Sequence, residues 1–292
     1  MVIVLAGAAY GESSEELLLT DFGARQLPWV TVNDNVMGGR SKGDFVVEEG
    51  ILVFTGSTNT NGGGFSSIRS RPQKLGLEGR EAIRLRVRGD GRTYTFRLAT
   101  GDSRANYWAE FPTTKDEWTE VRLPFDSFVA QWRGRRLDVP PPDPKKVESL
   151  GLMIYDKRDG AFRLEVDWIR AAAPFSLDGL KWKRRPMLVF APRGDDPRLK
   201  QQIDAVGEAR VGFEERDMAL IVVAPGHELS GAEREKLRAD FDVEDDAFAV
   251  RLVGKDGKVK QRAAEPVPMA DLYALIDRMP MRRSEMDAGS EE

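Results

Sequence analysis

The segment IRLRVRGDGRTYTFRL (83–98) shows the pattern on which the fold of the first half of the chain depends. Apolar residues alternate with arginine over 83–88, and aromatic and aliphatic residues alternate with other residues again over 94–98. A period of two residues is typical of a strand with one buried face. Because the Gly-Asp-Gly turn signal at 89–91 separates the two runs, we expect residues 83–98 to form a β-hairpin.

Other short apolar runs of the first half predict further strands, at 51–54, 107–111, 118–123, 151–155 and 162–169. In the last of these, Phe162, Leu164, Val166 and Trp168 share one face, so we expect Trp168 in the core. The Pro-rich segment 138–144 cannot be a central strand. Many short strands without a strong amphipathic helix predict an all-β sandwich or jelly roll over residues 17–173.

After about residue 174 the pattern changes to alternating strands and helices. Strands are predicted at 186–192, 218–223, 247–253 and 259–262, the last two as a hairpin, and helices at 197–209, 231–241 and 269–279. Asp196 with Pro197 is a good helix start, and Ser230 with Glu233 is a capping box. The order β-α-β-α-β-β-α is that of the thioredoxin fold. We therefore expect a domain boundary near 172–182, an α/β thioredoxin-like domain over 180–283 and a polar, disordered tail over 284–292.

The residue types of the chain exclude several classes of chemistry. The 292 residues include no cysteine and one histidine, His227, which we expect on a solvated turn. Thiol nucleophiles, disulfides and multi-histidine metal sites are therefore excluded. The formal net charge of -4 and the scattered basic residues give no argument for nucleic acid. We predict no catalytic residue, no metal site and no cofactor.

The N-terminal segment, residues 1–16, contains a short apolar run that ends in small residues. It is too short to span a bilayer, and it lacks the basic start of a signal peptide. One interpretation is a truncated signal peptide, which implies export to the periplasm. The other is a disordered start of a cytoplasmic protein. No transmembrane segment is predicted.

Two Gly-rich stretches, WVTVNDNVMGGRS (29–41) and NGGGFSSIRS (61–70), are the candidate binding site. We expect both to be structured loops, which are a common location of functional residues. Their polar side chains offer donors and acceptors for a sugar or a polar protein contact, with Trp132 as a candidate exposed aromatic contact. The predicted ligand- or partner-binding residues are Asn33, Asp34, Asn35, Ser41, Ser66, Ser67, Arg69 and Trp132. The alternative is that these residues cap turns and shape the end of the sandwich.

The outward residues of two predicted strands also allow two interpretations. Arg84, Arg86 and Arg88 share one face, as do Arg163, Glu165 and Asp167. They could line a ligand-binding face, or they could form a solvated surface with cross-strand ion pairs.

The first half resembles the complex I intermediate-associated protein family. The resemblance covers nearly all of residues 20–171 and is carried by Trp29, VNDNVMGG with Ser41 (32–41), GGGFSSIR (62–69), LPF (123–125) and VDWI (166–169). It implies a galactose-binding-like β-sandwich, and eukaryotic members of that family are mitochondrial assembly chaperones for respiratory complex I.

The second half resembles a bacterial family of unknown function with a thioredoxin-like fold. The matching segments are PMLVFAP (186–192), DDPRL (195–199), RDM (216–218), GKDG (254–257) and IDRMPMRR (276–283). Residues 192–196 hold the place where a redox thioredoxin carries Cys-x-x-Cys. Disulfide exchange is therefore chemically excluded, because the thiolate is the nucleophile.

These observations favour a non-enzymatic binding or assembly protein whose partner is an assembly intermediate and whose thioredoxin-like domain is a redox-inert interaction module. The alternative hypothesis is a carbohydrate-binding module protein of the cell envelope, with a glycan as partner. An enzyme that uses carboxylates alone is a third hypothesis.

Overall fold

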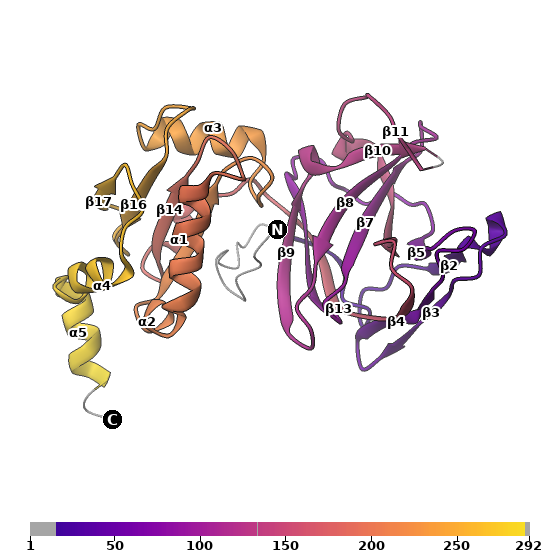
Figure 1. Cartoon of the computed structure of the whole chain (residues 1–292), viewed down its shortest axis with the longest axis horizontal. Helices are drawn as coiled ribbons and strands as arrows, with labels where there is room; N and C mark the ends of the chain where they lie inside the picture. Colours follow the sequence, from indigo (N-terminus) through magenta and orange to yellow (C-terminus); the bar gives the residue numbers. More distant parts are fainter. Residues whose placement is uncertain (1–15, 133, 290–292) are drawn as a thin grey trace. The chain divides into compact units, whose positions relative to one another are not determined.

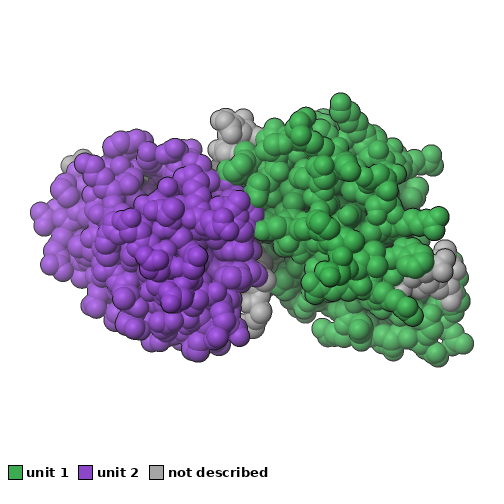
Figure 2. All heavy atoms as spheres, turned by 90° about the horizontal axis from the view of Figure 1, so that it is seen from above, with its two compact units in different colours: residues 1–7, 14–174 green, residues 8–13, 175–292 purple. Residues whose placement is uncertain are grey.

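The computed structural model describes residues 16–132 and 134–289, so the predicted signal segment lies almost entirely outside the described residues. The chain divides into two compact units, the first ending at Pro174 and the second beginning at Phe175 (Figure 2). Within the described residues, no helix is both long and apolar enough to cross a membrane.

The first unit is an all-β sandwich of two sheets (Figure 1). The six-stranded sheet has the strand order β3-β4-β13-β6-β9, and its sixth strand, β1, pairs with β13. The seven-stranded sheet has the strand order β11-β10-β8-β7-β12-β5-β2. The strands are β1 (Leu17–Thr20), β2 (Trp29–Asn33), β3 (Lys42–Glu48), β4 (Ile51–Thr58), β5 (Ser66–Ser70), β6 (Ala82–Arg88), β7 (Thr93–Thr100), β8 (Asn106–Pro112), β9 (Trp118–Pro124), β10 (Val129–Trp132), β11 (Arg135–Arg136), β12 (Val147–Ile154) and β13 (Gly160–Ala172).

The core of the sandwich lies between the two sheets. The six-stranded sheet contributes alternate residues such as Leu85 and Val166, and the seven-stranded sheet contributes residues such as Phe96 and Leu152. All four side chains are fully buried. At these four positions the alternation in the sequence marks the core face correctly.

The predicted hairpin over 83–98 is wrong. β6 pairs with β9 and β13, whereas β7 pairs with β8 and β12 in the other sheet. Residues 89–92 thus connect two facing sheets rather than two neighbouring strands. The two-residue period is the same in both cases, because each strand has one face on the shared core.

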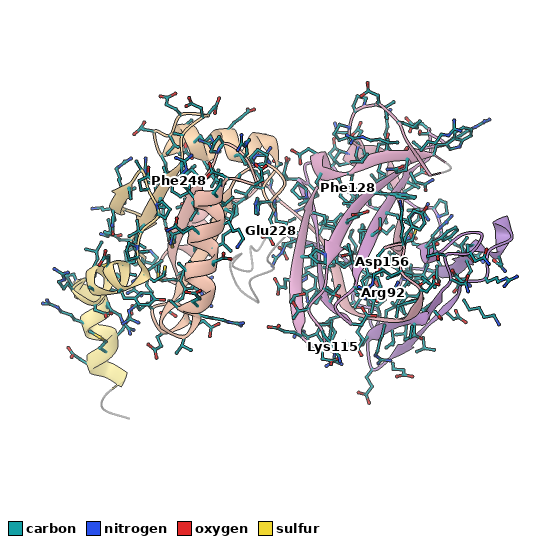
Figure 3. The ribbon with its side chains drawn as sticks, in the orientation of Figure 1. Arg92, Lys115, Phe128, Asp156, Glu228 and Phe248 are labelled. Carbon is teal, nitrogen blue, oxygen red and sulfur yellow. The ribbon has the colours of Figure 1, made fainter. Side chains whose placement is uncertain are left out.

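Arg92, at the end of this connection, joins the ends of the two sheets. Its Nε donates to Asp156 Oδ2, at the end of β12, at 2.9 Å, and its Nη2 donates to Thr58 Oγ1, in β4, at 3.0 Å. Its Nη1 donates to the carbonyls of Gly160 and Ala161, in β13, at 3.1 and 3.0 Å. The Arg92 and Asp156 side chains lie side by side in Figure 3. We call this arrangement the Arg92 clamp.

Trp168 is not in the core, contrary to the sequence prediction. The pairing of β13 with β6 shifts by one residue between Val166 and Trp168, which is a β-bulge. Ile169 takes the core position instead and is fully buried. Trp168 lies on the outer face, where the Arg170 guanidinium is 4.4 Å from the centroid of its ring.

The second unit has a mixed four-stranded sheet with helices. Its strand order is β15-β14-β16-β17, and only the β14–β15 pair is parallel. The elements are β14 (Arg185–Phe190), α1 (Pro197–Glu208), α2 (Arg210–Glu215), β15 (Met218–Val223), α3 (Gly231–Asp240), β16 (Ala249–Val253), β17 (Val259–Ala263), α4 (Met269–Asp277) and α5 (Pro280–Gly289).

Helices cover the sheet through the alternating side chains of its buried strands. Leu188 and Phe190 of β14 pack in one cluster with Leu237 of α3. Figure 1 shows α1 running across the sheet. The predicted starts of both helices are confirmed, since the Asp196 side chain accepts from the Arg198 N–H and the Ser230–Glu233 capping box is formed.

The predicted disordered tail is wrong for residues 284–289, which belong to α5. The physical reason is a buried charge. The Arg185 guanidinium is only 1 % exposed, and its Nη2 binds both carboxylate oxygens of Glu285, at 2.8 and 3.0 Å. Lys255 Nζ binds the same carboxylate at 2.8 Å. Because a buried guanidinium needs a counter-ion, these bonds order a segment whose composition is typical of a solvated tail.

We expect the substitution Arg92→Met to lower the free energy of unfolding of the first unit by about 3–5 kcal/mol, because it leaves the Asp156 carboxylate and several carbonyls buried without a partner. Urea denaturation followed by tryptophan fluorescence measures this change. Arg86→Met is the matched control. Arg86 forms an ion pair with Asp167 on a partly exposed face, and its loss should cost about 1 kcal/mol or less. Equal losses of unfolding free energy in the two variants would show that the Arg92 clamp stabilises the unit no more than an exposed ion pair does.

Candidate functional site

The two predicted loops are largely paired strands. Trp29–Asn33 forms β2 and Ser66–Ser70 forms β5, and the two strands are antiparallel neighbours. Between β2 and β3 the chain makes one turn of 3-10 helix, Asp34–Met37, which Gly38 ends in a left-handed conformation. The prediction that both stretches are loops is wrong for the residues of β2 and β5, because polar and glycine residues obscure the strand pattern there. They do lie side by side, as predicted.

Asp34 binds the two stretches together. Its carboxylate, which is fully buried, accepts hydrogen bonds from Ser41 Oγ at 2.6 Å, the Ser41 N–H at 2.9 Å and the Gly64 N–H at 2.7 Å. A weaker bond comes from the Phe65 N–H at 3.3 Å. A Cβ atom on Gly39 or Gly63 would overlap this carboxylate, so the adjacent glycines make room for it.

These hydrogen bonds stabilise the negative charge of the Asp34 carboxylate. Burial by itself would raise the pKa of the carboxyl group, but the hydrogen bonds from Ser41, Gly64 and Phe65 outweigh burial and lower the pKa below its ordinary value. The ionised form is therefore the stable form in the folded protein. Both carboxylate oxygens are occupied by the protein itself, so Asp34 has a structural role here.

The other predicted residues of this site are also engaged within the protein, apart from Asn35. Asn33 donates to the Gly43 carbonyl at 3.0 Å and accepts from Ser66 Oγ at 2.6 Å. Ser67 Oγ donates to the Val32 carbonyl at 2.9 Å. The side chain of Asn35 is exposed. The interpretation in which these residues shape the end of the sandwich fits this geometry.

Trp132 lies apart from this group. It ends β10, and three strands, β8, β7 and β12, separate β10 from β5 in the sheet. Its side chain is exposed, as predicted. The structure therefore brings Asn33, Asp34, Ser41 and Ser66 together and leaves Trp132 outside.

Arg69 belongs to a different feature, a row of residues across the outer face of the seven-stranded sheet. The strand register places Trp108 beside Arg97, Arg97 beside Gly151, Gly151 beside Arg69, and Arg69 beside Val30. We call these five residues the Arg97 row. Arg97 alternates with the core residues Phe96 and Leu98, so it points away from the core.

The guanidinium of Arg97 is buried without a counter-charge. The residue is 6 % exposed, and its Nε and Nη1 atoms have no hydrogen-bond partner. Burial, together with repulsion from the Arg69 charge, lowers the pKa of Arg97 to about 9. The group is still protonated at neutral pH. Burial lowers the pKa of Arg69 as well.

The aromatic residues beside Arg97 pack against protein groups. The Arg97 guanidinium lies 5.7 Å from the centroid of the Trp108 ring, and Trp108 meets Tyr155 edge to face, with centroids 6.1 Å apart. The buried Nε1 of Trp108 has no hydrogen-bond partner. Neither Arg97 nor Trp108 belongs to the site residues predicted from the sequence. The available signal was an arginine on the outward face of a strand, but only the strand order shows that this strand is central.

The arginines of the six-stranded sheet are arranged differently. Arg84 pairs with Glu16 and Glu120, Arg86 with Asp167, and Arg88 with Glu165. This face carries the cross-strand ion pairs of the second interpretation in the sequence analysis. These three arginines have counter-charges, so they are not a candidate site for an anion.

A family model described as complex I intermediate-associated protein 30 matches residues 20–166. The chain belongs to this family. A second model, a domain of unknown function (DUF4174), matches residues 176–285. The family resemblance inferred from the sequence is thereby confirmed for the first unit.

Two curated relatives match part of the chain. Complex I intermediate-associated protein 30, mitochondrial, of Mus musculus is 28% identical over 166 residues, which are 48% of this chain and 51% of that protein. Coiled-coil domain-containing protein 80 of Danio rerio is 31% identical over 157 residues, which are 46% of this chain and 18% of that protein. The chain thus spans about half of the mouse relative and less than a fifth of the zebrafish one.

Solved structures similar to this chain include a family 11 carbohydrate-binding module of Clostridium thermocellum, with a TM-score of 0.42 and 16% identity, over 56% of this chain and 98% of the module. An agarase matches with a TM-score of 0.41 and 10% identity, over 68% of this chain and 31% of the agarase.

We expect Asp34→Asn to lower the free energy of unfolding of the first unit by about 2–4 kcal/mol at neutral pH, because an amide group cannot accept all of the hydrogen bonds that the carboxylate accepts. The folded pKa of Asp34 is lowered, so its contribution is fully present above the ordinary carboxyl pKa of about 3.9 and is lost as pH falls through the folded pKa. Denaturation curves of the two proteins should therefore converge in acid.

Asn35→Ala is the control for this prediction, since the Asn35 side chain is exposed on the same turn. It should change the free energy of unfolding by less than about 0.5 kcal/mol. A stability difference between wild type and Asp34→Asn that stayed constant down to strongly acidic pH would contradict the role assigned to the carboxylate.

Proposed function

We propose that this chain is a non-enzymatic binding protein that assists the assembly of respiratory complex I by contacting an assembly intermediate. The observation that carries the proposal is the family match over residues 20–166. The name of the mouse relative describes that protein as associated with a complex I intermediate. This chain spans about half the length of that relative.

The state of the carboxylates supports a role in binding rather than catalysis. Burial would raise the pKa values of Asp34, Asp156 and Glu165, but hydrogen bonds and nearby arginines outweigh burial and lower all three. A general acid at neutral pH needs a raised pKa, so these groups are poor candidates. His227 belongs to the second unit, where burial lowers its pKa. It is partly buried rather than fully solvated as expected.

For the second unit we propose a thioredoxin-like fold that serves as an interaction module. The strand order β15-β14-β16-β17 and the parallel β14–β15 pair support this assignment. Residues 192–196 follow β14, where redox thioredoxins carry their cysteine pair. The chain has no cysteine, so this unit has no thiolate for disulfide exchange.

The alternative function is glycan binding by a protein of the cell envelope. Sugar-binding sheets commonly offer an open aromatic ring for stacking. On the outer face of the seven-stranded sheet, however, Trp108 is engaged by Arg97 and Tyr155, and Tyr155 is engaged also by Phe65. This packing favours a protein partner over a stacked sugar.

Affinity purification of the tagged full chain from its own host tests the proposal, with the tag alone as control. We expect complex I subunits to be enriched among the proteins identified by mass spectrometry. The same purified chain is applied to a glycan array. Binding to glycans without enrichment of complex I subunits would replace assembly with the alternative function, and the absence of both would contradict the proposal.

A further inference from the structure

The Arg97 row contains a charge that the folded protein does not neutralise. Three similarly buried arginines have carboxylate partners: Arg92 binds Asp156, Arg185 binds Glu285, and Arg84 binds two glutamates. Among residues 16–132 and 134–289, no hydrogen bond or ion pair joins an acceptor to the Arg97 guanidinium. An unpaired buried charge is costly, so its presence in a central strand needs an explanation.

The neighbouring acidic residue of β8 does not supply the missing partner. Glu110 of β8 is exposed, and the register places it opposite Thr95, two residues along each strand from the Arg97–Trp108 pair. The Trp108 Nε1 atom adds a third unpartnered donor beside the two of Arg97. The unsatisfied atoms of the row are thus all donors, which suits a ligand group that only accepts hydrogen bonds.

Gly151 lies between the two arginines on the sheet. A Cβ atom built on Gly151 would lie 3.4 Å from Arg97 Cβ and 3.5 Å from Arg69 Cγ, so the two arginine side chains flank this glycine on neighbouring strands. A side chain here would occupy the space between them. A carboxylate placed over Gly151 could accept from both guanidinium groups, and arginine binds carboxylates in a two-pronged geometry.

We propose that Arg97 and Arg69 form a carboxylate-binding subsite that takes an aspartate or glutamate side chain of a partner protein. This proposal rests on the proposed function and names the chemistry of its contact. A protein segment suits the row better than an acidic sugar does, because Trp108 packs against Arg97 and Tyr155 and because the exposed apolar side chain of Val30 continues the row beyond Arg69.

The subsite has a signature in the protein without its partner. Since the Arg97 charge is unpaired in the free protein, Arg97→Met should raise the melting temperature of the first unit by about 2–4 °C. If Arg97 had a purely structural role, Arg97→Met would lower the melting temperature. Arg86→Met, the matched control on the other sheet, should not raise the melting temperature.

Binding is tested with the full chain and a fluorescein-labelled Glu-rich peptide in a Gly/Ser background, together with the same peptide carrying Gln in place of Glu. Fluorescence anisotropy should show binding of the Glu peptide that is weakened at least about tenfold by Arg97→Met or by the Gln replacement. Arg97→Lys keeps the charge but loses the planar fork, so we expect an intermediate affinity. Arg86→Met should bind like the wild type.

Several outcomes would overturn the proposal. Equal weakening by Arg86→Met would indicate non-specific charge attraction. Binding of oligogalacturonate but not of the Glu peptide, lost in Arg97→Met, would assign the subsite to an acidic glycan. If neither probe bound in a way that depends on Arg97, the proposed subsite would be wrong.

The subsite and the proposed function can fail separately. If complex I subunits co-purify equally well with Arg97→Met, assembly stands and the subsite is wrong. If the Glu peptide binds as expected but complex I subunits do not co-purify, the subsite stands and the assembly function is wrong.

Discussion

The Arg92 clamp is the interaction on which the sandwich depends. It lies where the chain passes from one sheet to the other, and it bonds to β4 and β13 of one sheet and to Asp156 at the end of a strand in the other. A guanidinium suits this position because its five N–H groups lie in one plane and point in several directions. Burial would penalise the charge, and the Asp156 carboxylate compensates for that penalty.

Arg97 lies only five residues further along the same segment, but its surroundings lack the acceptors that surround Arg92. Both guanidinium groups are buried in the first unit, yet one is saturated with acceptors and the other has unpartnered nitrogens. Natural folds rarely retain an unsatisfied buried charge without a use for it. Arg92 is therefore part of the scaffold, whereas Arg97 belongs to the proposed binding surface.

The Asp34 carboxylate resembles the Arg92 clamp rather than the Arg97 row. Its acceptor positions are filled by the backbone and side chains of two chain segments that carry much of the family resemblance. The polar and glycine residues of this region therefore stabilise the local structure of the sandwich end. The binding chemistry lies on the adjacent sheet face, with Arg69 as the one predicted site residue that belongs to it.

The sequence by itself determined many of the strands, the starts of α1 and α3 and the absence of thiol chemistry, because periodicity, capping and residue type are local properties. It also marked Asp34, Ser41 and Ser66 as neighbours. Only the tertiary structure decided that β6 and β7 belong to different sheets, that a bulge turns Trp168 outward, and that Arg97 lies buried in a central strand. These features depend on which distant strand lies alongside, and an alternating pattern looks the same whichever partner the strand takes.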